Sequence, residues 1–170
     1  ICHAYLAESL ILQVSATINV GTTAGSNPAS LANPQRGAGL GFFAGTGTVA
    51  TPDNFRGLMI TTDGCLIFAQ HGFDGSPRAG LIEEIANGID TSLDHSLSFQ
   101  IDTNSGDLSN ILLNGNPQAD VSTTLFGSDI NEVGFFTSSS AGGTLGSFDD
   151  FTVTGIPEPS SLTILGLSGL

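Results

Sequence analysis

The feature that most constrains this chain is a strict alternation of apolar and other side chains over residues 10–20. Successive side chains of a β-strand point to opposite faces, so this period predicts a strand with one buried and one solvated face. A helix would spread the same residues around its circumference. The apolar positions are Leu10, Leu12, Val14, Ala16, Ile18 and Val20, and the positions between them are Ile11, Gln13, Ser15, Thr17 and Asn19.

Two further regions predict β-hairpins. Residues 97–102 alternate in the same way, and the turn-rich run 103–107 then leads into the apolar residues 111–113. Residues 58–61 and 65–68 are apolar runs that flank a short turn containing Asp63-Gly64. Additional strands are expected over residues 39–44, 80–86, 132–138 and 147–154. No stretch shows a helical period, so the sequence predicts an all-β antiparallel sandwich or barrel.

Length and charge restrict the classes of partner. The chain has 170 residues, room for one domain with a full core. Sixteen acidic residues against three arginines and no lysine give a formal net charge of −13. Such a field repels nucleic acid and disfavours anionic lipid surfaces. Divalent cations, neutral glycans and cationic polymers are compatible partners, and a purely solubilising role explains the same acidity.

Segments of the C-terminal half resemble the concanavalin A-like, laminin-G-like jelly roll. They are residues 96–102, the hairpin partner 111–115, residues 133–136 and the closing segment 148–154. In that family a hairpin presents an Asn/Asp-Gly turn, and a final strand that opens with Asp closes the sandwich. The resemblance implies a jelly-roll domain over residues 1–155, with the N-terminal half supported by its strand pattern.

The C-terminal segment resembles the PEP-CTERM sorting signal of Gram-negative bacteria that make an extracellular polysaccharide matrix. Pro157-Glu158-Pro159 precedes the apolar run 162–170. In that family a membrane-spanning helix and an Arg-rich tail follow, and an exosortase processes the signal. A spanning helix needs about 20 apolar residues. We therefore expect residues 156–170 to be a truncated signal and the start of a membrane segment, on an exported protein of the outer cell surface or matrix. The mixed first residues indicate that the N-terminus is incomplete as well.

The two cysteines leave two interpretations open. Cys2 and Cys65 are an even count in an export compartment, which permits a disulfide. Closing a loop of that size would stabilise the fold by about 4 kcal/mol. Two unrelated buried thiols explain the same count.

Asp149 and Asp150 open the last predicted strand and are candidate ligand-binding residues. Strand parity places Asp149 on the same face as Phe151 and Val153, and a carboxylate on a core face must be paired, hydrogen-bonded or bound to a metal. These residues could bind calcium or a sugar hydroxyl. Alternatively, Asp149 could accept N–H groups of a neighbouring loop and pin the corner.

Loops and one strand face supply the remaining binding candidates. Phe73 is the best candidate for an exposed ring on which a sugar could stack, and the adjacent Asp74 belongs to an Asp–Gly turn. The run 102–107 superficially resembles a calcium loop, but a turn that caps its own backbone explains it better. The polar ladder within residues 13–19 could meet a hydrated polymer.

We recognise no pattern of catalytic residues in the sequence. Glu83-Glu84 is an adjacent pair, but consecutive strand residues point to opposite faces and cannot act on one bond together. His3, His71 and His95 lie far apart and are expected to be ordinary turn or surface residues.

These observations lead to one expected function and two alternatives. We expect a non-catalytic, lectin-like protein that associates with extracellular polysaccharide, with calcium as an optional cofactor. Its further partners would be an exosortase-type enzyme and, transiently, the membrane. The alternatives are a self-assembling structural matrix protein without a specific glycan ligand, and a polysaccharide hydrolase or lyase with an unrecognised site.

Overall fold

The computed structural model describes residues 3–4, 11–21, 37–44, 55–70, 83–103, 105–122, 130–138 and 146–156. Every regular element in these ranges is a strand, which confirms the all-β class. The strands are β1 (His3–Ala4), β2 (Ile11–Asn19), β3 (Gly37–Ala44), β4 (Phe55–Thr61), β5 (Leu66–Gln70), β6 (Glu83–Ala86), β7 (His95–Asp102), β8 (Leu108–Leu113), β9 (Asn116–Pro117), β10 (Ile130–Ser138) and β11 (Ser147–Ile156). Within the same ranges, no helix is long and apolar enough to cross a membrane.

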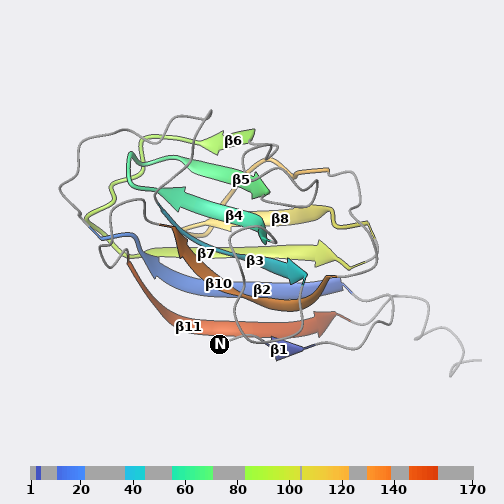
Figure 1. Cartoon of the computed structure of the whole chain (residues 1–170). Coiled ribbons are helices and arrows are strands. Elements are labelled where there is room, and N and C mark those ends of the chain that lie inside the picture. The colour runs from blue at the N-terminus through green and yellow to red at the C-terminus, as the bar shows by residue number, and fades with distance from the viewer. Residues whose placement is uncertain are drawn as a thin grey trace, which may run out of the picture.

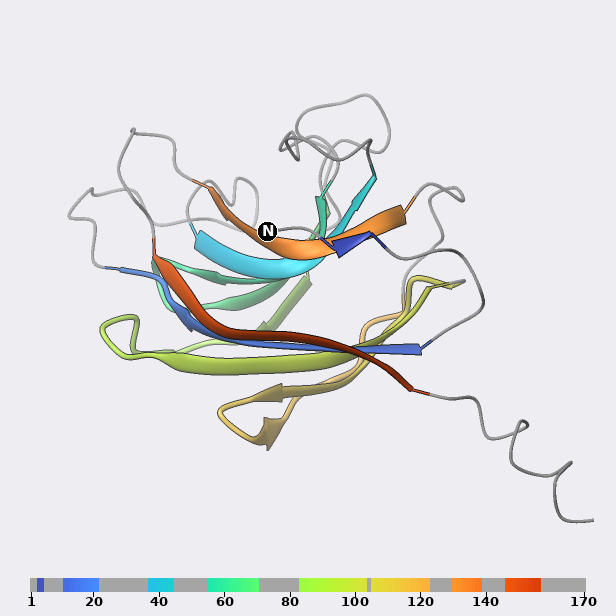
Figure 2. The ribbon, with the colours of Figure 1, turned by 90° about the horizontal axis from the view of Figure 1, so that it is seen from below.

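The described strands form two antiparallel sheets that pack face to face (Figures 1 and 2). One sheet has six strands in the order β1-β10-β3-β4-β5-β6, and the other has five in the order β11-β2-β7-β8-β9. Both expected hairpins are confirmed, because β4 pairs with β5 and β7 pairs with β8. The last strand, β11, lies beside β2 at the edge of the five-stranded sheet, although the two are far apart in sequence.

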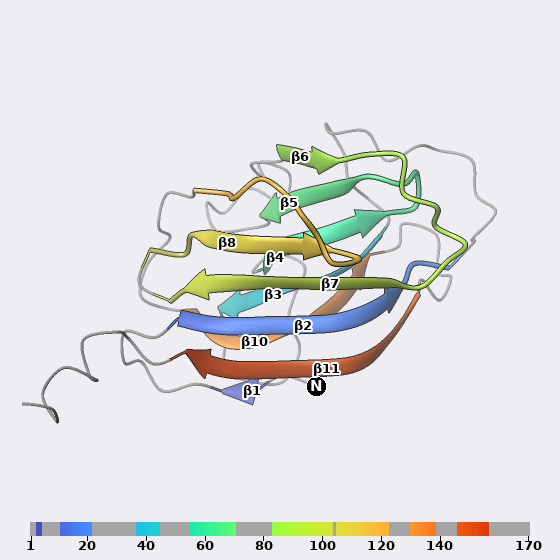
Figure 3. The same ribbon diagram turned by 180° about the vertical axis from the view of Figure 1, so that it is seen from behind.

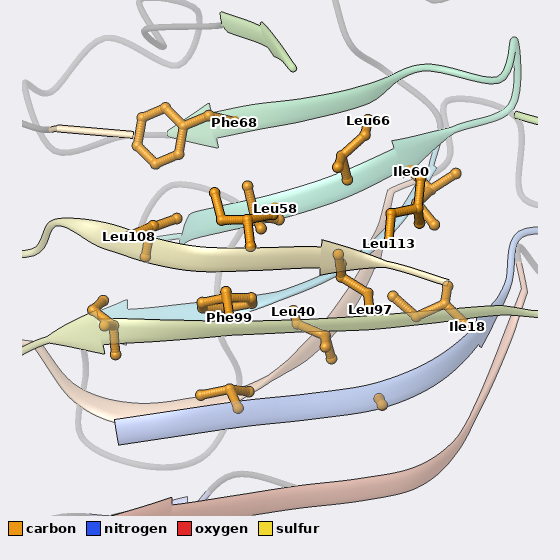
Figure 4. Close-up of a cluster of buried hydrophobic side chains, with 14 of the residues drawn as sticks. Ile18, Leu40, Leu58, Ile60, Leu66, Phe68, Leu97, Phe99, Leu108 and Leu113 are labelled. Atoms are coloured by element: carbon orange, nitrogen blue, oxygen red, sulfur yellow. The ribbon is translucent and has the colours of Figure 1, made fainter. Parts of the chain in front are cut away.

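The core lies between the sheets and follows the predicted alternation. In β2 every second residue is buried, and in β7 the buried positions include Leu97, Phe99 and Ile101. Burying a side chain of this size stabilises the fold by about 1.5–3 kcal/mol. The opposing sheet supplies Leu40, Phe42, Leu58, Ile60, Leu66 and Phe68 (Figure 4). Each sheet therefore turns one face toward the core and the other face outward.

Strand boundaries differ slightly from expectation. β3 and β10 begin two residues earlier than the alternation indicated, and β11 continues to Ile156. Of the segment expected at 80–86, the structure describes Glu83–Ala86 as β6.

Candidate functional site

Figure 3 shows β11, β2, β7 and β8 of the five-stranded sheet side by side and nearest the viewer. The outer face of these four strands carries uncharged polar side chains. The residues that alternate with them along each strand, such as Val14 and Phe99, are buried in the core. Because successive side chains of a strand point to opposite faces, these polar residues point to the solvent side. We call this set the polar face. It consists of Gln13, Ser15 and Thr17 of β2, Ser96, Ser98 and Gln100 of β7, Ser109 and Asn110 of β8, and Thr152 and Thr154 of β11.

Strand register arranges the polar face in rows that run across the sheet. Ser15 stands opposite both Thr152 and Ser98. Gln13 likewise stands opposite Thr154 and Gln100, and Gln100 opposite Ser109. Neighbouring strands are about 4.8 Å apart and alternate residues about 6.7 Å apart, so hydroxyl and amide groups recur on a grid. The half-buried Leu112, opposite Ser98, is an apolar position of the same face.

Hydrogen bonds hold part of this grid in place. The hydroxyls of Ser15 and Thr152 are 2.6 Å apart, and Asn110 Nδ2 donates to Gln100 Oε1 at 2.6 Å. Gln13 Nε2 donates to the carbonyl oxygen of Phe99 at 3.2 Å. By contrast, the hydroxyls of Thr17 and Ser98 make no hydrogen bond to any other described residue. Fixed amides and available hydroxyls together suit recognition of a hydroxyl-rich ligand.

The outer face of the six-stranded sheet is different, because its described residues in β3, β4, β5 and β10 are buried, and only the edge strand β6 exposes a described side chain there, Glu84. Leu58 and Phe68 point into the core, so the adjacent Met59 of β4 and Ile67 of β5 point to the opposite, outer face. Even so, Met59 and Ile67 are only 1% and 2% exposed. Gly39, Gly41, Gly57 and Gly134 share this outer face and are also buried. The accessible sheet face is therefore the polar face.

A β-bulge in β11 corrects the expected orientation of Asp149. The register shifts between Asp149, opposite Thr17, and Thr152, opposite Ser15, so one extra residue lies in β11. Asp150 takes the left-handed conformation with φ 52°. The extra residue reverses the parity: Phe148 and Phe151 both pack against the core, while Asp149 and Asp150 are both exposed. Asp149 is thus not on the core face, and its Oδ1 accepts the N–H of Asp150 at 2.8 Å.

β8 contains a second left-handed bulge in the same sheet. Asn110 has φ 49°, and the register of β7 and β8 shifts beside it. Its N–H donates to Asp120 Oδ1 at 2.9 Å, in addition to the side-chain bond to Gln100. The bulge turns Asn110 outward between the buried Leu108 and Ile111, and so adds an amide to the polar face.

Carboxylates border the polar face at both ends of its strands. Asp149 and Asp150 lie at the start of β11, and Asp94 accepts a hydrogen bond from Asn19 Nδ2 at 2.7 Å near the same end. At the opposite end Asp102 stands across from Ile11. In the described ranges, no three His, Cys, Asp or Glu residues are grouped so as to hold a metal ion. Calcium binding by this chain therefore stays a prediction.

The expectation that His95 is a turn or surface residue is wrong. His95 lies at the start of β7 and is buried, with only 4% of its surface exposed. Asn114 Oδ1 accepts the N–H of Ser96, which leaves Asn114 Nδ2 to donate to His95 Nδ1 at 2.9 Å. The other ring nitrogen, Nε2, therefore carries the proton and donates to the carbonyl oxygen of Asp90 at 2.7 Å. This network fixes the end of the sheet beside Asp149. The parity of 95, 97 and 99 was the available signal for its burial.

The run 102–107 is a turn, as expected. Ser105 N–H donates to Asp102 Oδ1 at 3.2 Å, and Gly106 N–H donates to the carbonyl oxygen of Asp102 at 2.7 Å. Glu83 and Glu84 are both exposed on β6 and take no part in the polar face. Phe73 and Asp74, like the sorting-signal residues Pro157, Glu158 and Pro159, lie outside the described residues.

The strand order gives no support to the disulfide. Cys65 is a free cysteine in the turn before β5, whereas Cys2 lies outside the described residues. His3, the covalent neighbour of Cys2, is on β1, four strand positions from β5. Four strand spacings amount to about 19 Å, and a disulfide needs Cα atoms closer than about 7 Å. Burial and the nearby Asp63 carboxylate raise the pKa of the Cys65 thiol.

Comparison with solved structures confirms the jelly-roll fold. A CBM40 domain of the Ruminococcus gnavus IT-sialidase, bound to α2,3-sialyllactose, matches with a TM-score of 0.51 and 16% identity over 91% of this chain and 81% of that one. The Caenorhabditis elegans galectin LEC-6 matches with a TM-score of 0.49 and 16% identity, over 91% and 89% of the two chains. Domains LG4-5 of the mouse laminin α1 chain match with a TM-score of 0.39 and 16% identity, over 90% of this chain and 39% of that one.

An enzyme is also among the structural matches. An alginate lyase from Pseudomonas aeruginosa matches with a TM-score of 0.48 and 13% identity, over 87% of this chain and 66% of that one. No family model and no curated protein sequence matches the chain. At these identities the structural matches establish the fold, and function must be argued from the site.

Proposed function

We propose that the domain is a non-catalytic, lectin-like module that binds extracellular polysaccharide on its polar face. The observation that carries the proposal is the ordered grid of hydroxyl and amide groups on the accessible sheet face, part of it held by the hydrogen bonds Ser15–Thr152 and Asn110–Gln100. Side chains that are already ordered lose little conformational entropy when a ligand binds. The CBM40 domain with the same fold is bound to an oligosaccharide, which agrees with this assignment.

The arrangement of charged groups supports binding without catalysis. A glycosidase of the usual type needs two carboxyl groups about 5–9.5 Å apart on either side of one bond. Asp149 and Asp150 are adjacent at a bulge, and the residues of the polar face between the strand ends carry no ionisable group. Such a surface can hold a glycan through hydrogen bonds, but it presents no acid and base pair across a bound sugar.

The cellular setting follows from the sequence resemblance and is part of the proposal. A PEP-CTERM-like signal at Pro157-Glu158-Pro159 would bring the protein to an exosortase and to the outer surface or matrix of a Gram-negative bacterium. An acidic domain without lysine suits a hydrated polymer matrix better than a nucleic-acid or lipid partner. Expression with the complete C-terminal signal in a host with and without its exosortase tests this setting, and unchanged size and location in both hosts would contradict it.

An array of immobilised polysaccharides, probed with and without calcium, tests the function. The proposal expects saturable binding to at least one polymer, with no reducing sugar or unsaturated product released. Thr17→Ala with Ser98→Ala removes two available hydroxyls and should weaken binding about tenfold, since each hydrogen bond contributes about 0.5–1.5 kcal/mol. Thr62→Ala, in the turn between β4 and β5 of the other sheet, is the matched control and should bind normally.

Two results of the array would contradict the proposal. Product release would identify an enzyme. Concentration-dependent polymerisation without a glycan signal would identify a structural protein. Binding abolished by a chelator would instead support the calcium-assisted form of the proposal.

A further inference from the structure

The charged side chains that the structure describes around the polar face are all acidic. Asp94, Asp149 and Asp150 lie at one end, and Asp102 lies at the other. A ligand group seated over Ser15, in the middle, is about 8–14 Å from these carboxylates, given about 3.3 Å per residue along a strand and about 4.8 Å between neighbouring strands. Any charge on a bound glycan therefore lies within the field of several carboxylates at once.

No positive charge of the face itself offsets this field. The ten residues of the polar face are uncharged, and the whole chain has only three arginines and no lysine against sixteen acidic residues. Recognition of a sugar carboxylate or sulfate normally relies on Arg or Lys, because paired, charge-assisted hydrogen bonds offset the loss of hydration. The hydroxyls of Thr17 and Ser98 and the amide of Gln100 suit neutral sugar hydroxyls, with which they can exchange donor and acceptor roles.

We propose that the polar face selects neutral, hydroxyl-rich glycans and excludes acidic ones by the carboxylates that border it. This selectivity rests on the proposed glycan-binding function and specifies its ligand class. It also separates this chain from the CBM40 domain of the same fold, whose bound sialyllactose carries a carboxylate. The protein would then associate with uncharged stretches of a polymer and avoid uronic acid, sialic acid or sulfated units.

The expected loss of affinity for acidic glycans follows from the distance between the ligand's charge and the bordering carboxylates. Two like charges about 10 Å apart in water weaken an association about twofold. Four bordering carboxylates together should weaken the binding of a singly charged sugar about tenfold relative to its neutral counterpart. The Debye length is about 10 Å at 0.1 M salt and about 3 Å at 1 M. The difference should thus be largest at low ionic strength and shrink as salt is added.

Pairs of related ligands in which only one member carries acidic groups test the selectivity. Lactose and 3′-sialyllactose form one pair, and highly methyl-esterified and de-esterified polygalacturonate form another, with each affinity measured at 20 mM and 500 mM salt alongside the glycan array. The proposal expects the neutral member to bind about tenfold more tightly at low salt and the gap to close at high salt. Equal or tighter binding of the acidic members would overturn the selectivity and leave glycan binding intact. Absence of binding to every glycan, neutral or acidic, on the array as well, would refute the proposed function itself.

A pair of charge variants tests the cause. Asp149→Asn with Asp150→Asn removes two bordering charges, and Asn suits both the left-handed φ at 150 and the acceptor role of the side chain at 149. This variant should bind the acidic ligands about fourfold more tightly at low salt and the neutral ones unchanged. The control, Glu83→Gln with Glu84→Gln, removes two exposed charges from the other sheet and should change neither. If both variants behave alike, the bordering carboxylates do not set the selectivity.

Discussion

The bulge at Asp150 offers a sharp test of the architecture. Its φ of 52° costs an ordinary L-residue about 1–2 kcal/mol, and Asp, Asn and Gly tolerate this conformation best. The side chain is exposed, so a substitution changes the backbone preference without opening a cavity. Asp150→Val should therefore lower the free energy of unfolding by about 1–2 kcal/mol, whereas Asp150→Asn should stay within about 0.5 kcal/mol of the parent.

The chain cannot avoid this cost by straightening the strand. Removing the extra residue from the pairing would shift the register by one and turn Asp149 toward the core. For a chain of 170 residues, 1–2 kcal/mol corresponds to a fall in Tm of about 2–8 °C, which calorimetry or urea denaturation resolves. Thr154→Val is the matched control, an exposed position of the same strand, and should be neutral. Equal stability of Asp150→Val and Asp150→Asn would refute the bulge.

Two further predictions concern the end of the sheet. Asn114→Gly keeps a residue that tolerates the φ of 52° at this position, but it leaves the buried His95 Nδ1 and the Ser96 N–H without their partner. It should destabilise the fold by about 1–3 kcal/mol in urea denaturation, while a comparable loss in the exposed control Asn116→Gly would contradict the network. The second prediction concerns Asp90, whose pKa is held below its ordinary value of 3.8 by hydrogen bonds from Ser92. The ionised carboxylate therefore stabilises the fold above that pH. This contribution is lost as the pH falls through the lowered pKa. The urea midpoint of Asp90→Asn should thus lie furthest below that of the parent at neutral pH and converge with it as the pH falls through the lowered pKa. A gap between the two midpoints that widens on acidification would contradict this prediction.

Much of the fold could be predicted because the alternation of buried and exposed residues in β2 and β7 follows directly from the alternation of side chains in the sequence. The turn residues between the strands predicted which strands pair as hairpins. The bulges were missed because simple parity counts assume that no residue is inserted. The signal was present in the spacing: Phe148 and Phe151, three apart, both face the core. Two core residues of one strand can be an odd number apart only if a residue between them is bulged.

The site was harder to predict than the fold because it depends on which strands become neighbours. The sequence showed the polar ladder of β2, but the rows arise from pairing with β7 and from the closure of β11 on β2. Both pairings join residues far apart in the chain. The covering of the opposite face at Met59 and Ile67 is likewise a tertiary property, and it is what singles out the polar face.

Amide chemical-shift mapping tests the central claim most directly. A 15N-labelled domain would be titrated with a neutral oligosaccharide fragment of the best polymer found on the array. The account predicts that the perturbed amides cluster in β2, β7 and β11, around residues 13–17, 96–100 and 152–154, with β4 and β5 unchanged. Perturbations centred on residues 58–60 and 66–68, with the polar face silent, would contradict it.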